Sequence, residues 1–96
     1  MTANDNDRPV RPASTEVEAA IVRLLAKADA GRTISPMDAA RKLVPPGSDW
    51  HPLMPAVRRA AVELARAGRL VIYRKGKPVD PENFKGVYRL GLPRQD

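Results

Sequence analysis

The arginines and lysines of this chain are the residues whose type and spacing could do chemistry, and that chemistry is the binding of an anion. Arg59 and Arg66 are seven positions apart, which is two helical turns, so on a helix they share a face that Arg58 flanks. An arginine guanidinium can donate two hydrogen bonds to guanine O6 and N7, or bind a phosphate. A hairpin that follows this helix carries four more candidate phosphate contacts: Arg74, Lys75, Lys77 and Lys85.

Glu63 lies between the helical arginines and argues against strong binding. A carboxylate on a reading helix repels phosphates, unless it accepts a hydrogen bond from cytosine N4. An alternative interpretation leaves the cations without a nucleic-acid partner. In that case Arg58 and Arg59 are solvated or paired with Glu63, and the hairpin lysines only oppose edge-to-edge pairing of strands.

Catalysis and metal binding find little support in the sequence. His51 stands beside Asp49, but we expect residues so close in sequence not to face each other, and no nucleophile accompanies them. The chain has no cysteine and one histidine, and its carboxylates lack the spacing of a calcium loop. We therefore predict no enzyme activity, no metal site and no cofactor.

The charge is unevenly distributed along the chain. The formal net charge is +6, and residues 69–94 hold seven basic side chains against two acidic ones. Residues 14–30 have a slight acidic excess instead. Like charges on one face favour a polyanionic partner, either a nucleic acid or an acidic protein.

The ends of the chain and its hydropathy predict location. The N-terminus lacks the pattern of a signal peptide, and no apolar run approaches a membrane span, so we expect a cytoplasmic protein without membrane contact. Residues 1–13 are polar, contain prolines and show no periodicity, which predicts a disordered tail.

Two helices can be placed from their caps. Thr15 and Glu18 form a capping box for the first helix, which the Ala30-Gly31 pair ends. Ser35, as N-cap before a proline, begins the second helix, and the segment 44–47 (VPPG) ends it. Apolar spacing predicts that the first helix buries Val17, Ile21, Leu24, Leu25 and Ala28, and the second Met37, Ala40 and Leu43.

A third helix is expected from about residue 52 to 67, with Gly68 after it. Pro55 suggests that its regular part begins a few residues late. The apolar side chains at helical spacing are Leu53, Val57, Ala60, Ala61 and Leu64. Trp50, just before this helix, is expected to pack on the core.

A basic hairpin completes the pattern. Residues 69–75 and 87–90 predict two strands, joined by a loop of residues 76–86 that Phe84 holds against the body. Tyr73 and Tyr88 are candidate cross-strand partners. The short segment Thr33-Ile34 can add a third strand beside the hairpin.

The order of these elements predicts an α+β fold, a winged helix-turn-helix with three helices, a small antiparallel sheet and a basic β-hairpin. We call the hairpin, residues 69–90, the wing. The domain is expected to span residues 14–92, followed by a C-terminal tail of residues 93–96.

Several segments resemble a small bacterial winged-helix family of unknown function. They are ISPMDAARKL at 34–43, Trp50 with LM at 53–54 and VR at 57–58, GRLVIYRKGK at 68–77, VDP at 79–81 and FKGVYRL at 84–90. The resemblance covers about residues 17–90. It implies the same fold, and it implies no activity.

The sequence thus predicts a small nucleic-acid-binding protein, with duplex DNA as the preferred partner and transcriptional regulation as a candidate role. The alternative is a protein–protein interaction module that uses a face of the winged helix and binds no nucleic acid.

Overall fold

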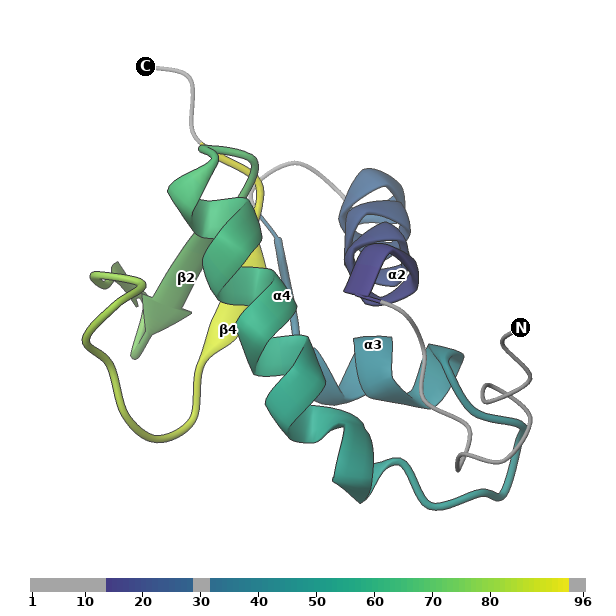
Figure 1. The fold of residues 1–96 in the computed structure, drawn as a ribbon. Coiled ribbons are helices and arrows are strands. Elements are labelled where there is room, and N and C mark those ends of the chain that lie inside the picture. The colour runs from purple at the N-terminus through teal and green to yellow at the C-terminus, as the bar shows by residue number, and fades with distance from the viewer. Residues whose placement is uncertain (1–13, 29–31, 94–96) are drawn as a thin grey trace, which may run out of the picture.

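A computed structural model describes residues 14–28 and 32–93 of the chain. The predicted tail at 1–13, the Ala30-Gly31 helix end and residues 94–96 lie outside the described residues. The elements are α2 (Ser14–Lys27), β1 (Thr33–Ile34), α3 (Pro36–Lys42), the 3-10 helix η1 (His51–Leu53), α4 (Met54–Arg66), β2 (Val71–Arg74), β3 (Lys77–Pro78) and β4 (Arg89–Gly91) (Figure 1).

Helix α2 packs on both α3 and α4 through its buried residues Val17, Ile21 and Leu25. The predicted cap at Thr15 is wrong, because the helix already includes Ser14 and Thr15. Both polar residues are suitable caps by type, and their order in the sequence does not reveal that the helix begins before Thr15.

Helix α3 begins at the predicted capping box. The Ser35 hydroxyl accepts a hydrogen bond from the Met37 amide at 3.2 Å, and the Ser35 amide donates to the Asp38 carboxylate at 3.1 Å. The predicted inner face is wrong in part: Met37 is exposed, whereas Pro36, Ala39 and Ala40 are buried. Small residues such as Ala39 and Ala40 let α3 approach its neighbours closely. A search for large apolar side chains therefore does not identify the buried face of this helix.

Helix α4 follows η1 and, as predicted, has Pro55 in its first turn. Its buried residues are Val57, Ala60, Ala61 and Leu64, which confirms the predicted stripe except for Leu53, which is only partly buried. The helix ends where expected, since Gly68 has a φ of +77° and the Arg69 amide donates to the Leu64 carbonyl at 2.9 Å.

The sheet has four antiparallel strands in the order β1-β4-β2-β3. Ile34 and Ile72 both pair with Leu90, so the predicted third strand at Thr33–Ile34 is confirmed. The additional strand, β3, pairs with β2 across a tight turn. The predicted Tyr73–Tyr88 pair is wrong, because Arg89 stands opposite Tyr73.

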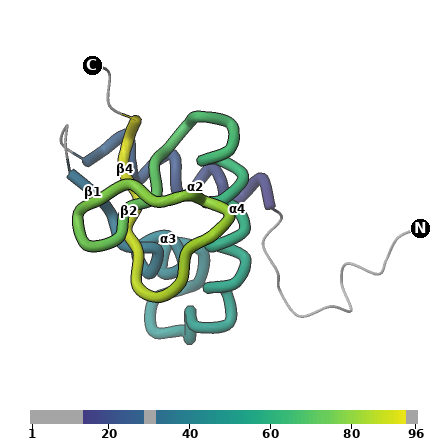
Figure 2. The backbone as a smooth tube through the Cα atoms, turned by 90° about the vertical axis from the view of Figure 1, so that its left-hand side faces the viewer, coloured from purple at the N-terminus to yellow at the C-terminus, as the bar shows by residue number. Residues whose placement is uncertain are grey.

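Within the described residues the fold is therefore α+β, with three α-helices and a small antiparallel sheet, as predicted. The core lies between helices and sheet and contains Ile21, Leu25, Leu64, Ile72 and Leu90 among its most buried side chains. Figure 2 views the molecule from the side of the segment between β2 and β4, which spreads in front of the helices. Within the described residues, no helix is both long and apolar enough to cross a membrane.

Candidate nucleic-acid interface

The exposed side of α4 presents Arg59, Glu63 and Arg66, as their spacing predicted. Arg66 is held by two carboxylates: its Nε lies 3.2 Å from Glu82 Oε2 and its Nη1 lies 3.5 Å from Glu63 Oε2. Exposed ion pairs of this kind contribute little to stability, about 0–1 kcal/mol each. They do offset the positive charge of Arg66, so Arg59 is the cation that α4 leaves for a ligand.

Glu82 is a member of this cluster that the sequence did not reveal. It lies in the wing, and no helical or cross-strand spacing connects it with Arg66. The contact arises because the loop between β3 and β4 folds back toward the C-terminal end of α4. An Asx-type turn, in which the Glu82 amide donates to Asp80 Oδ1 at 2.9 Å, shapes the loop at this point.

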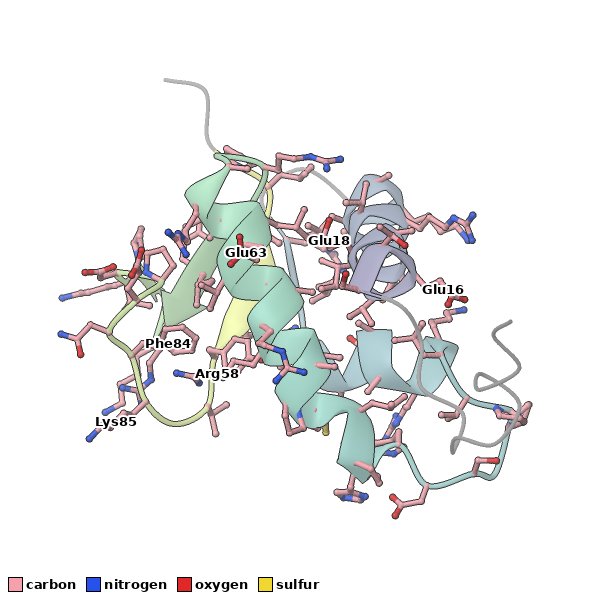
Figure 3. All side chains as sticks on the ribbon, in the orientation of Figure 1. Glu16, Glu18, Arg58, Glu63, Phe84 and Lys85 are labelled. Carbon is pink, nitrogen blue, oxygen red and sulfur yellow. The ribbon has the colours of Figure 1, made fainter. Side chains whose placement is uncertain are left out.

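Arg58 points toward the wing and away from the outer face of α4 (Figure 3). Its Nη2 donates a hydrogen bond to the Phe84 carbonyl at 2.6 Å, and its guanidinium carbon lies 3.8 Å from the centre of the Phe84 ring. The Tyr88 ring meets Phe84 edge-on, with ring centres 5.1 Å apart. Arg58 thus fastens the wing to α4. It is partly buried there, and its hydrogen bond and ring contact are with the wing and not with Glu63.

Burial of this cluster changes the chemistry of Tyr88. Desolvation raises the pKa of the Tyr88 hydroxyl, and the positive charge of Arg58 opposes that shift to a smaller extent. The hydroxyl oxygen is buried without a hydrogen-bond partner among the described residues. The cluster therefore has a structural role, and Phe84 pins the wing as the sequence predicted.

Arg74 braces the wing internally, between strand β2 and the segment before β4. Its Nε donates to the Val87 carbonyl at 3.0 Å, and its guanidinium lies against Gly86, which has a φ of +88°. A Cβ atom at Gly86 would lie 2.9 Å from Arg74 Nη2, so glycine suits both the backbone conformation and the contact. Arg74, predicted as a phosphate contact, is half-buried in this brace.

The three wing lysines, Lys75, Lys77 and Lys85, are exposed like Arg59 and Arg66. Lys75 and Gly76 form the two-residue turn between β2 and β3, with φ values of +52° and +81°. Lys77 lies on the edge strand β3, and Lys85 projects from the loop (Figure 3). All three are exposed, and none forms an ion pair with a residue in the described part of the chain.

The geometry separates the seven predicted residues into two groups. One group has partners within the protein: Arg58 and Arg74 donate hydrogen bonds to carbonyls of the wing, and Arg66 pairs with the Glu82 carboxylate. The available cations are Arg59, Lys75, Lys77 and Lys85.

His51 and Asp49 do meet, contrary to expectation. His51 Nδ1 lies 2.7 Å from Asp49 Oδ1, which also accepts a hydrogen bond from the His51 amide at 3.0 Å. These two hydrogen bonds, that of the side chain first, hold the pKa of Asp49 below its usual value. Both side chains are exposed, and the His51 ring stacks on Trp50 with ring centres 4.0 Å apart.

The Asp49–His51 pair stabilises the entry into η1, because one carboxylate oxygen holds both the backbone and the side chain of His51. Trp50 is partly buried against the core, as predicted, and the Arg41 guanidinium lies 5.4 Å from its ring centre. Nowhere in residues 14–28 and 32–93 do three or more histidine or carboxylate side chains gather as metal ligands would.

A family model matches residues 14–93 of the chain, and its description is "Protein of unknown function (DUF3253)". No curated protein matches the chain.

Proposed function

The chain belongs to the DUF3253 family, and we propose that it is a winged-helix protein that binds duplex nucleic acid, DNA in the first place, mainly through its wing. The observation that carries the proposal is the set of three exposed lysines on a braced hairpin, Lys75, Lys77 and Lys85. The hairpin is held to α4 by Arg58 and braced internally by Arg74, so it presents its charges with little further loss of backbone freedom on binding. The proposal extends to a cytoplasmic location and a role in transcriptional regulation.

Helix α4 supports a lesser contribution to sequence recognition. Arg59 is available for a base edge, but Glu63 and Glu82 surround Arg66 with negative charge. A carboxylate pair at this end of α4 disfavours close approach of phosphates. We therefore expect binding that depends on phosphate contacts and duplex shape, with a weak preference for sequence.

A fluorescence anisotropy titration with random duplex DNA at several salt concentrations tests the proposal. Each phosphate contact contributes about 0.9 to the slope of log affinity against log salt. Replacement of Lys75, Lys77 and Lys85 by glutamine should flatten that slope by about 2.7 units if each lysine binds one phosphate. Undetectable binding at low salt would overturn the proposal and favour the protein–protein interaction module.

A matched control removes the same charge elsewhere. Arg23, Lys27 and Lys42 are exposed cations on α2 and α3, outside the wing. Their replacement by glutamine should leave the slope unchanged. Equal flattening by both triple variants would show that net charge, rather than the wing, determines affinity.

Arg59→Ala separates base reading from phosphate binding. If Arg59 contacts a base, a selection from random duplexes should return a different preferred sequence for the variant than for the wild type. A uniform loss over all duplexes would make Arg59 a phosphate contact.

A further inference from the structure

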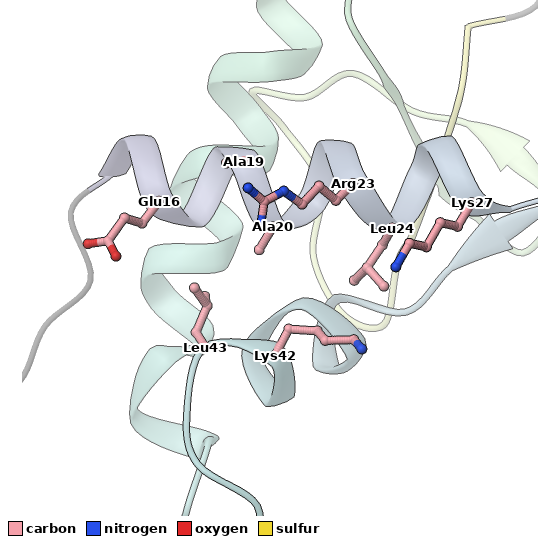
Figure 4. A pocket seen from close by; sticks show the side chains of 8 residues that line it. All are labelled: Glu16, Ala19, Ala20, Arg23, Leu24, Lys27, Lys42 and Leu43. Atoms are coloured by element: carbon pink, nitrogen blue, oxygen red, sulfur yellow. The ribbon is translucent and has the colours of Figure 1, made fainter.

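A groove of about 400 Å³ lies between α2 and α3. These two helices stand on the other side of α4 from the wing (Figure 1). Helix α2 forms one wall of the groove along most of its length, and the C-terminal end of α3 forms the other (Figure 4). The groove is thus separate from the proposed nucleic-acid interface.

The floor of the groove is apolar. Leu24 from α2 and Leu43 from the end of α3 extend into the space between the helices, and Ala20 of α2 borders the same space (Figure 4). Leu24 and Leu43 pack against the core and are only partly buried, so each keeps a surface that a further apolar side chain could cover. Covering such surface removes apolar area from water, which favours formation of a complex.

The rim of the groove carries three cations and one carboxylate, that of Glu16 at the N-terminal end of α2. Arg23, Lys27 and Lys42 line it and are exposed, and none of the three has an ion-pair partner within the described part of the chain. Lys27 and Lys42 extend toward the same end of the groove from opposite walls (Figure 4). The helix dipoles account for a lysine in each last turn, but they do not account for Arg23 in the middle of α2.

The shape favours a helix as the occupant. Helix α2 has 14 residues, and groove residues recur along it from Glu16 to Lys27, which corresponds to about three turns or roughly 16 Å. The apolar part of the lining, Ala19, Ala20, Leu24 and Leu43, occupies the middle of this length. An apolar strip between two helices suits the apolar face of a third helix. The cations on both walls then require carboxylates on the flanks of that helix.

We propose that the groove between α2 and α3 binds an acidic amphipathic helix of a protein partner. Its apolar side chains contact Leu24 and Leu43, and its carboxylates pair with Arg23, Lys27 and Lys42. This interaction goes beyond nucleic-acid binding and does not depend on it, because the wing remains uncovered when the groove is filled.

A synthetic peptide tests the proposal. The probe is a capped helical peptide with leucines along one stripe and glutamates beside them, and its control has the same composition in an order that destroys the stripe. We expect saturable binding of the probe to the full chain at physiological salt. In a two-dimensional NMR titration, the shifted amide signals should belong to α2 and the C-terminal end of α3.

Charge-reversal variants complete the test. Arg23→Glu combined with Lys42→Glu should weaken binding of the probe at least tenfold, whereas Lys75→Glu with Lys77→Glu should leave it unchanged. All four positions are exposed, so thermal unfolding should confirm that both variants fold. Equal binding of the control peptide, shifts confined to the wing, or no saturable binding would overturn the proposal.

Discussion

Replacement of Arg58 by methionine should loosen the wing and destabilise the protein. The hydrogen bond from Arg58 to the Phe84 carbonyl has a charged donor, and such bonds contribute about 1.5–3 kcal/mol. The cation–π contact with the Phe84 ring adds roughly 0.5–2 kcal/mol. One guanidinium makes both contacts, so the two do not simply add, and we expect a loss of about 2–3 kcal/mol in the free energy of unfolding.

Equilibrium denaturation compares Arg58→Met with Arg59→Met. Methionine and arginine have similar helix propensity, and methionine keeps the apolar stem, so the pair isolates the guanidinium. Arg59 is exposed, and its variant should stay within about 0.5 kcal/mol of the wild type. For a domain of this size, the Arg58 variant should melt roughly 8–20 °C lower.

Hydrogen exchange locates the effect. Amides of the segment between β3 and β4 should lose protection in Arg58→Met and keep it in Arg59→Met. A double-mutant cycle with Phe84→Leu, which keeps the backbone carbonyl of residue 84, should give a coupling energy of about 0.5–2 kcal/mol for the cation–π contact alone. Additivity in the cycle would remove that contact from the account, and equal losses for the two arginine variants would refute the role of Arg58 as a brace.

Other perturbations test the same structure. Tyr88→Phe removes a buried hydroxyl without a partner in the described residues, and thermal denaturation should show a gain of up to about 1 kcal/mol. Because its pKa is raised in the folded state, the unfolded tyrosine ionises first above about pH 10, so wild-type stability should fall there more steeply than that of Tyr88→Phe. In chemical denaturation, Gly76→Ala should lower the free energy of unfolding by about 1–2 kcal/mol, because alanine is strained at a positive φ. Gly86→Ala should lower it further, because the added Cβ atom would also displace the Arg74 guanidinium that donates to the Val87 carbonyl. Ser35→Ala should lower the free energy of unfolding by about 1 kcal/mol in the same assay, since it removes the α3 cap.

Local signals made much of the fold predictable. A serine cap followed by a proline specifies the start of α3, because both effects act within one helical turn. The apolar spacing in α4 likewise identifies Val57, Ala60 and Leu64, since a single helix face must cover the core.

Contacts between distant segments were not predictable in the same way. Arg58 and Phe84 are far apart in sequence, and no periodicity relates a helix to a loop. The pairing of Tyr73 with Arg89 depends on where the long loop ends, and a shift of one residue in the register of β4 changes the partner of Tyr73 from Tyr88 to Arg89. Strand β3 is only two residues long and contains a proline, so strand propensity does not reveal it.

The candidate interface was predicted in outline and revised in detail. Cations are easy to count in a sequence, but their availability depends on acceptors that only the fold brings near. Arg66 gains the Glu82 carboxylate as a partner, and Arg74 gains the Val87 carbonyl. Lys75 and Lys85 form no ion pair within the described residues. In the proposed complex the wing lysines therefore supply more of the phosphate contacts than the arginines of α4 do.

The strand order β1-β4-β2-β3 has a consequence for synthesis on the ribosome. Strand β4 lies between β1 and β2, although it follows both of them in the chain. While translation proceeds, α2, α3, α4 and β2 emerge before Leu90, the residue that pairs with both Ile34 and Ile72. The sheet cannot close until β4 has left the exit tunnel, so ribosome-bound chains whose β4 is still inside the tunnel should stay sensitive to proteases and bound by chaperones.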